Sequence, residues 1–202
     1  MANLDLVGLD GISRTQGRAG KDGALIVSEY AARYQELTRL SKVFNAYAIV
    51  TAPVIFSTAA GTGGPLLWNG SADVDAVLLA VGFGSTVVTT VAASLGMTGA
   101  TGQPVAPTTT TAADAQGEGY IGGPVALCTP YRVGTPLVAG QFFLPFAQVH
   151  TGALTVDTTG VQWVDLGGSI IVPPQCWASP AASATATTLV AQISLVWAEV
   201  RH

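Results

Sequence analysis

Beyond residue 42 the chain consists of short runs rich in valine, isoleucine, threonine and aromatic residues, separated by glycine and proline. This texture predicts the strands of a sandwich or barrel rather than alternating strands and helices. In the clearest run, every second residue from Leu189 to Trp197 is apolar, and the residues between them are apolar enough for both faces to be covered. The predicted strands are 43–56, with a break at Pro53, 75–82, 86–93, 120–128, 141–149, 161–166, 168–172 and 189–200.

The segments before residue 43 have a different pattern. Residues 1–23 carry repeated glycines among polar and basic neighbours, which predicts a flexible or extended segment. Over residues 25–40, the spacing of Tyr30, Tyr34 and Leu37 favours a short amphipathic helix, with an extended segment as the alternative. We therefore expect an N-terminal arm over residues 1–42 and a jelly-roll-like β-sandwich body over residues 43–202.

One long stretch of the body has no strand pattern. Residues 96–119 are rich in glycine, proline and threonine, and a loop of this length in a compact domain is usually disordered or used for binding. We expect a loop here that protrudes from the body.

Charge is scarce and unevenly placed. Only 10% of the residues are charged, against about 25% in an ordinary soluble domain, and 49% are hydrophobic. More than half of the charged residues precede residue 43, and no lysine follows Lys42. The net charge of −4 is too small to keep an apolar monomer soluble by repulsion. We expect other copies of the chain, or partners, to cover much of the body.

Several classes of protein are disfavoured. The uncharged stretch over residues 76–113 is interrupted by glycines, threonines and Pro104, so it does not predict a membrane-spanning helix. The first residues lack the pattern of a secretory signal, and we expect Cys128 and Cys176 to be reduced and buried. With His150 and His202, these cysteines do not form the usual pattern of a closed zinc site. We expect no metal and no cofactor.

No motif carries a clear catalytic signature. The AGKDG segment at residues 19–23 lacks the Ser or Thr of a phosphate loop, and GFGST at residues 82–86 is not a nucleophile elbow. His150 is the only internal histidine, and we interpret it as a packed strand residue. Asp73 and Asp75 fit a polar turn better than a calcium or acid–base site. We expect no catalytic residues.

Two groups of residues are candidates for binding. The tryptophans 68, 163, 177 and 197 fit an aromatic sugar platform less well than core or subunit packing, and we predict an oligomer interface at Trp163, Trp177 and Trp197. Arg14, Arg18 and Lys21 form the only basic cluster. This cluster fits contact with an acidic protein surface, or an ordinary solvated tail, better than nucleic acid.

Three segments carry a resemblance to a known family. They are Arg33-Tyr34-Gln35-Glu36 followed by Val43-Phe44, the stretch from Asp165 to Pro174 (DLGGSIIVPP), and the closing Trp197-Ala198-Glu199. In order and separation they resemble the cement or decoration proteins of tailed-bacteriophage capsids. That resemblance implies a homotrimer at three-fold or quasi-three-fold positions that clamps neighbouring copies of the major capsid protein.

The sequence thus leads to a virion structural protein without catalytic activity, made in the host cytoplasm and placed on the capsid surface. We expect no nucleic acid or membrane among its partners, and Arg14, Arg18 and Lys21 as the capsid contact of the arm. The alternatives are a neck, tail or fibre-base protein of the virion and a carbohydrate-binding jelly roll. An enzyme of the cupin kind is disfavoured because its metal site needs clustered histidines.

Overall fold

The computed structural model describes residues 5–7, 14–16, 35–50, 54–55, 64–87, 93–113, 115–119, 121–149, 162–183 and 190–201. The chain divides into two compact units, Met1–Leu40 and Ser41–His202, where the sequence predicts a division at residue 42. We call the second unit the body.

The first unit holds two short strands and one helix. Strands β1 (Asp5–Val7) and β2 (Arg14–Gln16) pair antiparallel, which is local order that the glycine pattern of residues 1–23 does not predict. Helix α1 (Gln35–Arg39) lies within the predicted helical range of 25–40, and residues 25–34 are outside the described part of the chain.

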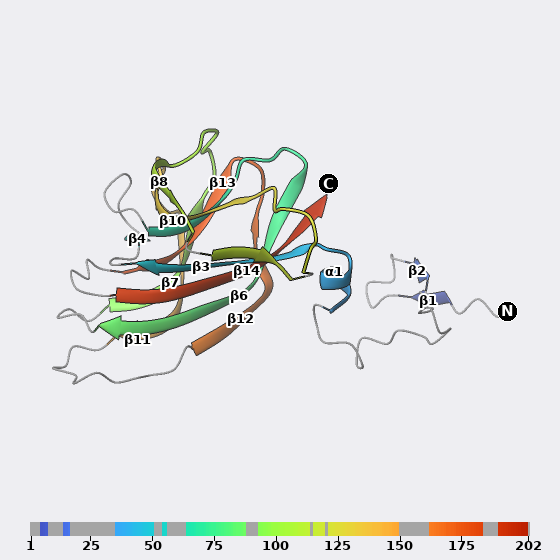
Figure 1. Cartoon of the computed structure of the whole chain (residues 1–202), viewed down its shortest axis with the longest axis horizontal. Coiled ribbons are helices and arrows are strands. Elements are labelled where there is room, and N and C mark those ends of the chain that lie inside the picture. The colour runs from blue at the N-terminus through green and yellow to red at the C-terminus, as the bar shows by residue number, and fades with distance from the viewer. Residues whose placement is uncertain are drawn as a thin grey trace. The chain divides into compact units, whose positions relative to one another are not determined.

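Eight strands of the body form the two sheets of a jelly roll (Figure 1). In chain order they are β3 (Val43–Val50), β5 (Gly64–Asn69), β6 (Val74–Val87), β7 (Ala93–Ala100), β11 (Phe142–Val149), β12 (Gln162–Val172), β13 (Cys176–Ala182) and β14 (Val190–Arg201). One sheet has the order β12-β6-β14-β3 and the other β11-β7-β13-β5, and all these neighbours pair antiparallel. In each sheet, strands that are distant in the chain lie side by side, and these two strand orders are those of a jelly roll. The predicted fold class is therefore confirmed.

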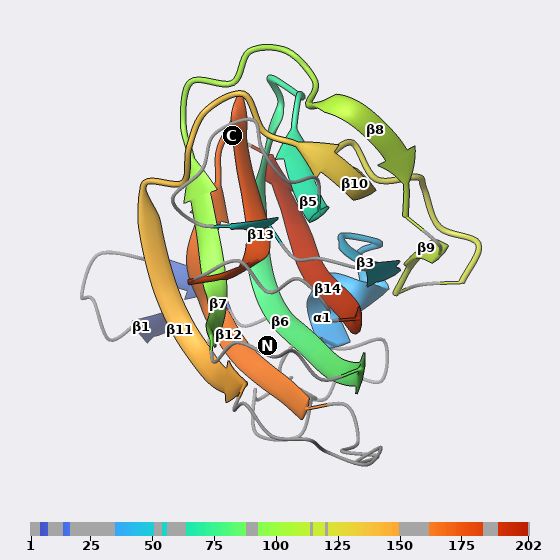
Figure 2. The ribbon, with the colours of Figure 1, turned by 90° about the vertical axis from the view of Figure 1, so that its left-hand side faces the viewer.

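An insertion between β7 and β11 extends both sheets on the same side (Figure 2). It contains β8 (Thr108–Ala112), β9 (Ala115–Glu118) and β10 (Thr129–Thr135). Strands β10 and β8 continue the seven-stranded sheet beyond β5, and β9 continues the five-stranded sheet beyond β3. The short β4 (Val54–Ile55) pairs parallel with β13.

The insertion corrects two predictions. The range 96–119 is not one irregular loop, because it contains the end of β7 and the strands β8 and β9. The range 120–128 is not a strand where it is described, and the strand begins at Thr129. In the insertion, pairing with β5 and β3 gives the backbone its hydrogen bonds, and that pairing decides the strand limits more than local composition does.

The core lies between the inner faces of the two sheets. Along β14, Ala191, Ile193, Leu195 and Trp197 point inward and are buried, as the predicted alternation requires. The Trp197 ring stacks on Phe44 of β3, with ring centroids 6.0 Å apart. These contacts place the largest side chain of β14 in the middle of the main cluster.

The resembling segment DLGGSIIVPP forms a bulge and a turn. Within β12 the register with β6 jumps from Asp165 opposite Ala80 to Ile170 opposite Leu78. Gly167 and Gly168 have φ values of 59° and 77°, and the Gly167 amide donates a hydrogen bond to the Asp165 carboxylate at 2.8 Å. The two strands predicted over 161–166 and 168–172 are therefore one bulged strand in its described part.

A buried amide ties this strand to the neighbouring turns. The Asn69 side chain donates hydrogen bonds to the carbonyl oxygens of Val74, at 2.7 Å, and Val172, at 2.9 Å. The Gln175 amide, in the turn after the two prolines, donates to the carbonyl of Asn69. The end of β12 is thereby fixed against the β5–β6 turn, which fixes the wall of the cleft described below.

Candidate functional site

Two of the three tryptophans predicted to form an oligomer interface are buried in the single chain. Trp197 lies in the core between the sheets, and Trp177 lies on the outward face of β13 under Val138 from the segment between β10 and β11. A side chain that is buried within one chain cannot contact a second copy. The prediction is therefore wrong for Trp177 and Trp197.

Trp163 is different, because it is 59% exposed. It stands opposite Gly82 in the β12–β6 ladder, on the side of the five-stranded sheet that faces away from the core. A Cβ atom on Gly82 would lie 3.2 Å from the Trp163 ring, so the ring rests flat over this glycine. The glycine lets an aromatic side chain lie on the sheet while most of its surface still faces solvent.

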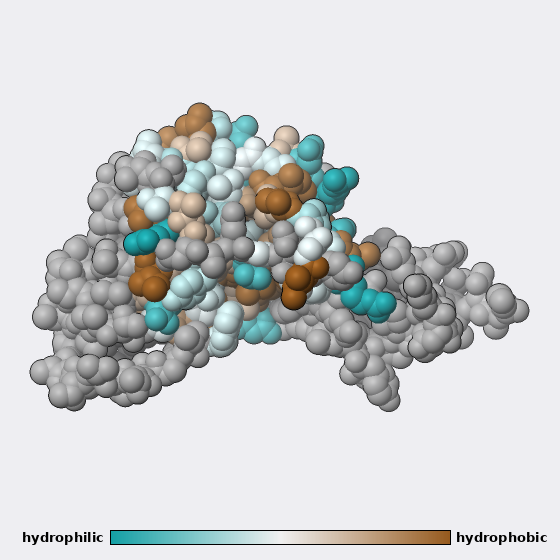
Figure 3. All heavy atoms as spheres, in the orientation of Figure 1, coloured by the Kyte–Doolittle hydropathy of each residue, from teal (hydrophilic) through white to brown (hydrophobic). Residues whose placement is uncertain are grey.

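The outward side of the five-stranded sheet has little charge. The side chains that alternate with the core positions are mostly apolar or small, and Ile171 and Ile49 are exposed. Figure 3, which views the body mainly from the side of the insertion, shows separate hydrophobic patches among weakly polar residues there as well. We call this surface the outer sheet face, formed by Asn45, Tyr47, Ile49, Asp75, Val77, Ala80, Gly82, Trp163, Asp165, Ile171, Gln192, Ser194, Val196 and Val200.

The outer sheet face approaches the size of one side of a protein interface. With strands about 4.8 Å apart and residues about 3.4 Å apart, four strands from Gln192 to Val200 cover about 600 Å² in projection. A stable interface buries about 800 Å² on each partner. Only Asp75 and Asp165 carry charge among the residues that define this surface. Depletion of charge over a surface of this extent is typical of the centre of a protein interface.

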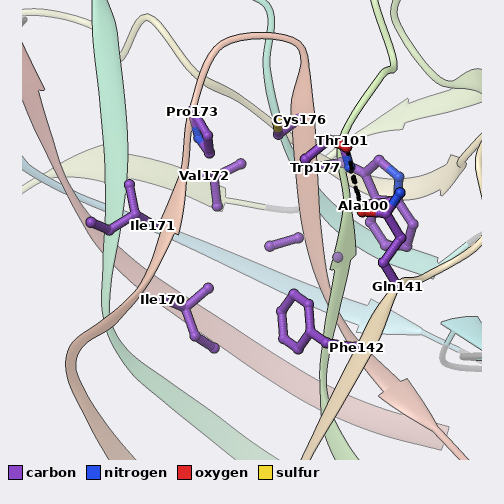
Figure 4. A pocket seen from close by; sticks show the side chains of 12 residues that line it. Ala100, Thr101, Gln141, Phe142, Ile170, Ile171, Val172, Pro173, Cys176 and Trp177 are labelled. Carbon is purple, nitrogen blue, oxygen red and sulfur yellow. Dashed lines mark hydrogen bonds between the residues drawn. The ribbon is translucent and has the colours of Figure 1, made fainter.

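An apolar cleft opens between the two sheets at their β11 and β12 edges (Figure 4). Its volume is about 90 Å³. Phe142 comes from one sheet, Ile170 and Val172 come from the other, and Figure 4 shows their side chains converging on the cleft. At its rim, the backbone amide and the hydroxyl of Thr101 donate to the Gln141 side-chain oxygen at 3.4 Å. The cleft offers hydrocarbon surface and no charged group among its lining residues.

The segment between β9 and β10 presents apolar side chains to solvent. Ile121 is 96% exposed, Val125 is 77% exposed and Leu127 is also exposed. We call residues 121–127 the apolar loop. A surface loop is usually polar, so three exposed aliphatic side chains in one short loop indicate a contact surface.

A buried carboxylate holds the base of the apolar loop. Glu199 of β14 accepts hydrogen bonds from the amides of Leu127, at 3.0 Å, and Cys128, at 2.8 Å. The indole nitrogen of Trp197 donates to the same carboxylate at 3.3 Å. Three donors compensate a charge that burial would otherwise make costly. Glu199 thus fixes the end of the apolar loop to the central strand of the five-stranded sheet.

The Cys128 thiol beside Glu199 is buried, and both cysteines are free, as predicted. Burial raises the pKa of the Cys128 thiol, and the charge and hydrogen bonding of Glu199 raise it further. Burial also raises the pKa of Cys176. Neither thiol has the lowered pKa that activates a nucleophilic cysteine.

The raised thiol pKa predicts a loss of stability in alkali. The unfolded chain loses the Cys128 proton above about pH 8.5, whereas the folded chain keeps it. The contribution of the Cys128 thiol to the free energy of unfolding is therefore complete below about pH 8.5. Above that pH it falls by about 1.4 kcal/mol per pH unit. Urea unfolding between about pH 8.5 and pH 10.5, compared between the wild type and Cys128→Ala, measures this slope. Parallel pH profiles of the two proteins would contradict the assignment.

The other candidate residues are not brought together into a reactive site. Asp73 is exposed in the β5–β6 turn, where its amide donates to the Ser71 hydroxyl, in agreement with a polar turn. In the described part of the chain no three His, Cys, Asp or Glu side chains gather as metal ligands would. His150 and His202 lie outside that part.

One residue of the basic cluster lies in the described part of the chain. Arg14 is the first residue of β2, while Arg18 and Lys21 lie outside the described residues. Their predicted contact with a capsid therefore stays a prediction. No helix within the described ranges is long and apolar enough to cross a membrane.

Comparison of the chain with protein-family models, with curated proteins and with solved structures found no match.

Sequence reasoning missed the cleft and the apolar loop. The cleft joins residues from β7, β11, β12 and β13, which only the strand order brings together. The apolar loop had a usable signal, because Gly122, Gly123 and Pro124 interrupt the apolar residues of the range 120–128 and disfavour a strand there. The role of Glu199 had a signal too, since it is the one carboxylate in the apolar closing strand.

Proposed function

We propose that this chain is a structural subunit of a virus particle, a cement or decoration protein that binds the outside of the capsid and bridges neighbouring coat subunits. It works by association and catalyses no reaction. The proposal includes self-association and contact with the major capsid protein.

The observation that carries this proposal is the outer sheet face. Four adjacent strands present a flat surface with Trp163 and Ile171 exposed and with little charge. Burying apolar surface contributes roughly 25 cal/mol per Å², and such a surface gains this energy when a partner covers it. On a capsid, the same energy would oppose separation of the bridged coat subunits.

The fold and the sequence add further support. Jelly rolls occur in viral capsid proteins and in lectins, so the fold fits both the proposal and its carbohydrate-binding alternative. Two of the segments resembling cement proteins lie in the body, where DLGGSIIVPP forms the bulge and turn of β12 and Glu199 fixes the apolar loop. The resembling residues thus position the cleft and the loop of this chain.

The carbohydrate-binding alternative has less support from the tryptophans. A sugar platform needs aromatic faces open to solvent. Trp177 is buried, and the half-buried Trp68 donates its indole hydrogen to the carbonyl of Gln103 at 3.1 Å. Trp163 offers one open ring. A neck, tail or fibre-base position in the virion remains the second candidate, because the outer sheet face would serve any ring of subunits.

Particles from the genome that encodes the chain test the proposal, prepared with and without an intact gene for it. We expect the chain in purified wild-type particles, as density on the outside of the head. We expect particles without it to release their genome at a lower temperature, because the bridging contacts are lost. Density only at the neck or tail would favour the second candidate. Absence of the chain from purified particles would reject a virion role.

A further inference from the structure

The apolar loop is a fixed projection rather than a free segment. At one end the Gly119 amide donates to the carbonyl of Val43 at 2.7 Å, and at the other the amides of Leu127 and Cys128 donate to Glu199. Between these anchors, Gly122 has a φ of 82°, which turns the chain. The loop therefore presents Ile121 and Val125 outward at a defined place beside β3.

The cleft has the size to receive one side chain of this loop. Its 90 Å³ is smaller than the cavity of about 150 Å³ that holds benzene, and it fits a branched aliphatic side chain. Phe142, which is 39% exposed, stands at its mouth. Neither the cleft lining nor residues 121–127 include a charged residue, so their contact would desolvate no charge.

The two features lie at opposite edges of the sandwich. The loop is anchored on β3 and β14 and leads into β10, on the side where the insertion extends both sheets. The cleft opens at β11 and β12, which end the two sheets on the other side. Figure 2 shows β11 and β12 on the left and the connection from β9 to β10 on the right. When copies are arranged in a row, the apolar loop of one copy therefore faces the cleft of the next.

We propose that copies of this chain associate head to tail, with the apolar loop of one copy inserted into the β11–β12 cleft of the next. Such a contact joins two different surfaces, so it builds a ring when the rotation between copies closes. Ile171 lies on β12 between Ile170 and Val172 of the cleft wall, and its side chain points to the other side of the strand, onto the outer sheet face, so the interface continues from the cleft onto that face at Trp163. This continuation supplies area that a short loop lacks, toward the roughly 800 Å² per partner of a stable interface.

The test uses charge substitutions on each half of the contact. One variant combines Ile121→Asp with Val125→Asp in the loop, and the other is Phe142→Asp at the mouth of the cleft. The control is Val105→Asp, which replaces an apolar side chain that is 55% exposed and lies outside both surfaces. The mass of the purified full chain is measured by sedimentation over a range of concentrations, and circular dichroism and thermal melting check that each variant is folded.

We expect the wild type and Val105→Asp to form the same closed oligomer. Each of the two other variants should dissociate with a dissociation constant raised about 100-fold or more, since burial of large apolar side chains is lost. A mixture of the loop variant and the cleft variant should form 1:1 dimers, because each supplies the half that the other lacks. A monomeric wild type, or variants that keep the wild-type mass, would overturn the inference.

The inference rests on the proposed function only in expecting copies to associate. Because the head-to-tail contact is tested on isolated protein, it can be rejected independently of the virion role. A monomer that still binds the capsid rejects the head-to-tail contact, whereas a ring that is missing from particles rejects the virion role.

Discussion

Replacing Trp197 by alanine is expected to lower the free energy of unfolding by about 3–5 kcal/mol. The side chain has no exposed surface, packs in the main core cluster and stacks on Phe44. Its removal leaves a cavity in the central strand of the five-stranded sheet, and it takes one donor from the Glu199 carboxylate. Chemical denaturation followed by circular dichroism measures the loss.

The matched control is Trp163→Ala. It removes the same side chain from the outer sheet face, where 59% of it is exposed, so we expect a loss below about 1 kcal/mol in dilute monomer. In self-association or capsid binding the order should reverse, with Trp163→Ala showing the clear defect in a folded protein. Equal losses of stability in the two variants would contradict the assignment of one tryptophan to the core and the other to the surface.

Replacing Glu199 by alanine is expected to cost about 3 kcal/mol or more, because the amides of Leu127 and Cys128 and the indole of Trp197 lose their acceptor. The base of the apolar loop would open. Hydrogen exchange measures this opening directly. In Glu199→Ala the amides of Leu127 and Cys128 should exchange faster than in the wild type, while the exchange rates of the β12 amides should not change.

Glu199→Gln separates charge from shape. The amide side chain fills the same space and keeps one acceptor oxygen, but its NH2 group faces an amide donor, so we expect a smaller loss than with alanine. Unchanged exchange at Leu127 and Cys128 in both variants would show that the carboxylate does not hold the loop.

The strands with regular alternation were predictable from the sequence. The pattern of the range 189–200 gave β14 within a residue at each end, because one buried face imposes a period of two, and the apolar run in the range 141–149 gave β11. Strands β5 and β13 were missed. They carry Gly64–Pro65 and Ser179–Pro180, which argue against a strand locally, and both faces of β13 are buried. Their strand conformation depends on neighbours that are distant in the chain.

Whether each tryptophan is buried or exposed was less predictable. Each of Trp163, Trp177 and Trp197 lies on a strand, and local sequence does not reveal which face of each strand is covered. Trp177 points away from the sandwich core, yet it is buried because Val138 from the insertion packs with it. Trp163 points outward on an edge strand where no such layer covers it. The difference lies in the path of the insertion, which depends on tertiary pairing.

Strand order also determines when this body can fold. β14, the last strand of the body, lies between β6 and β3, so the five-stranded sheet cannot join these two earlier strands before β14 has been synthesised. Until then a nascent chain on the ribosome carries β3 and β6 with open edges and uncovered apolar faces, which favours aggregation and slow folding. We therefore expect folding to follow synthesis of the whole body, and production at low temperature or with chaperones to raise the soluble yield.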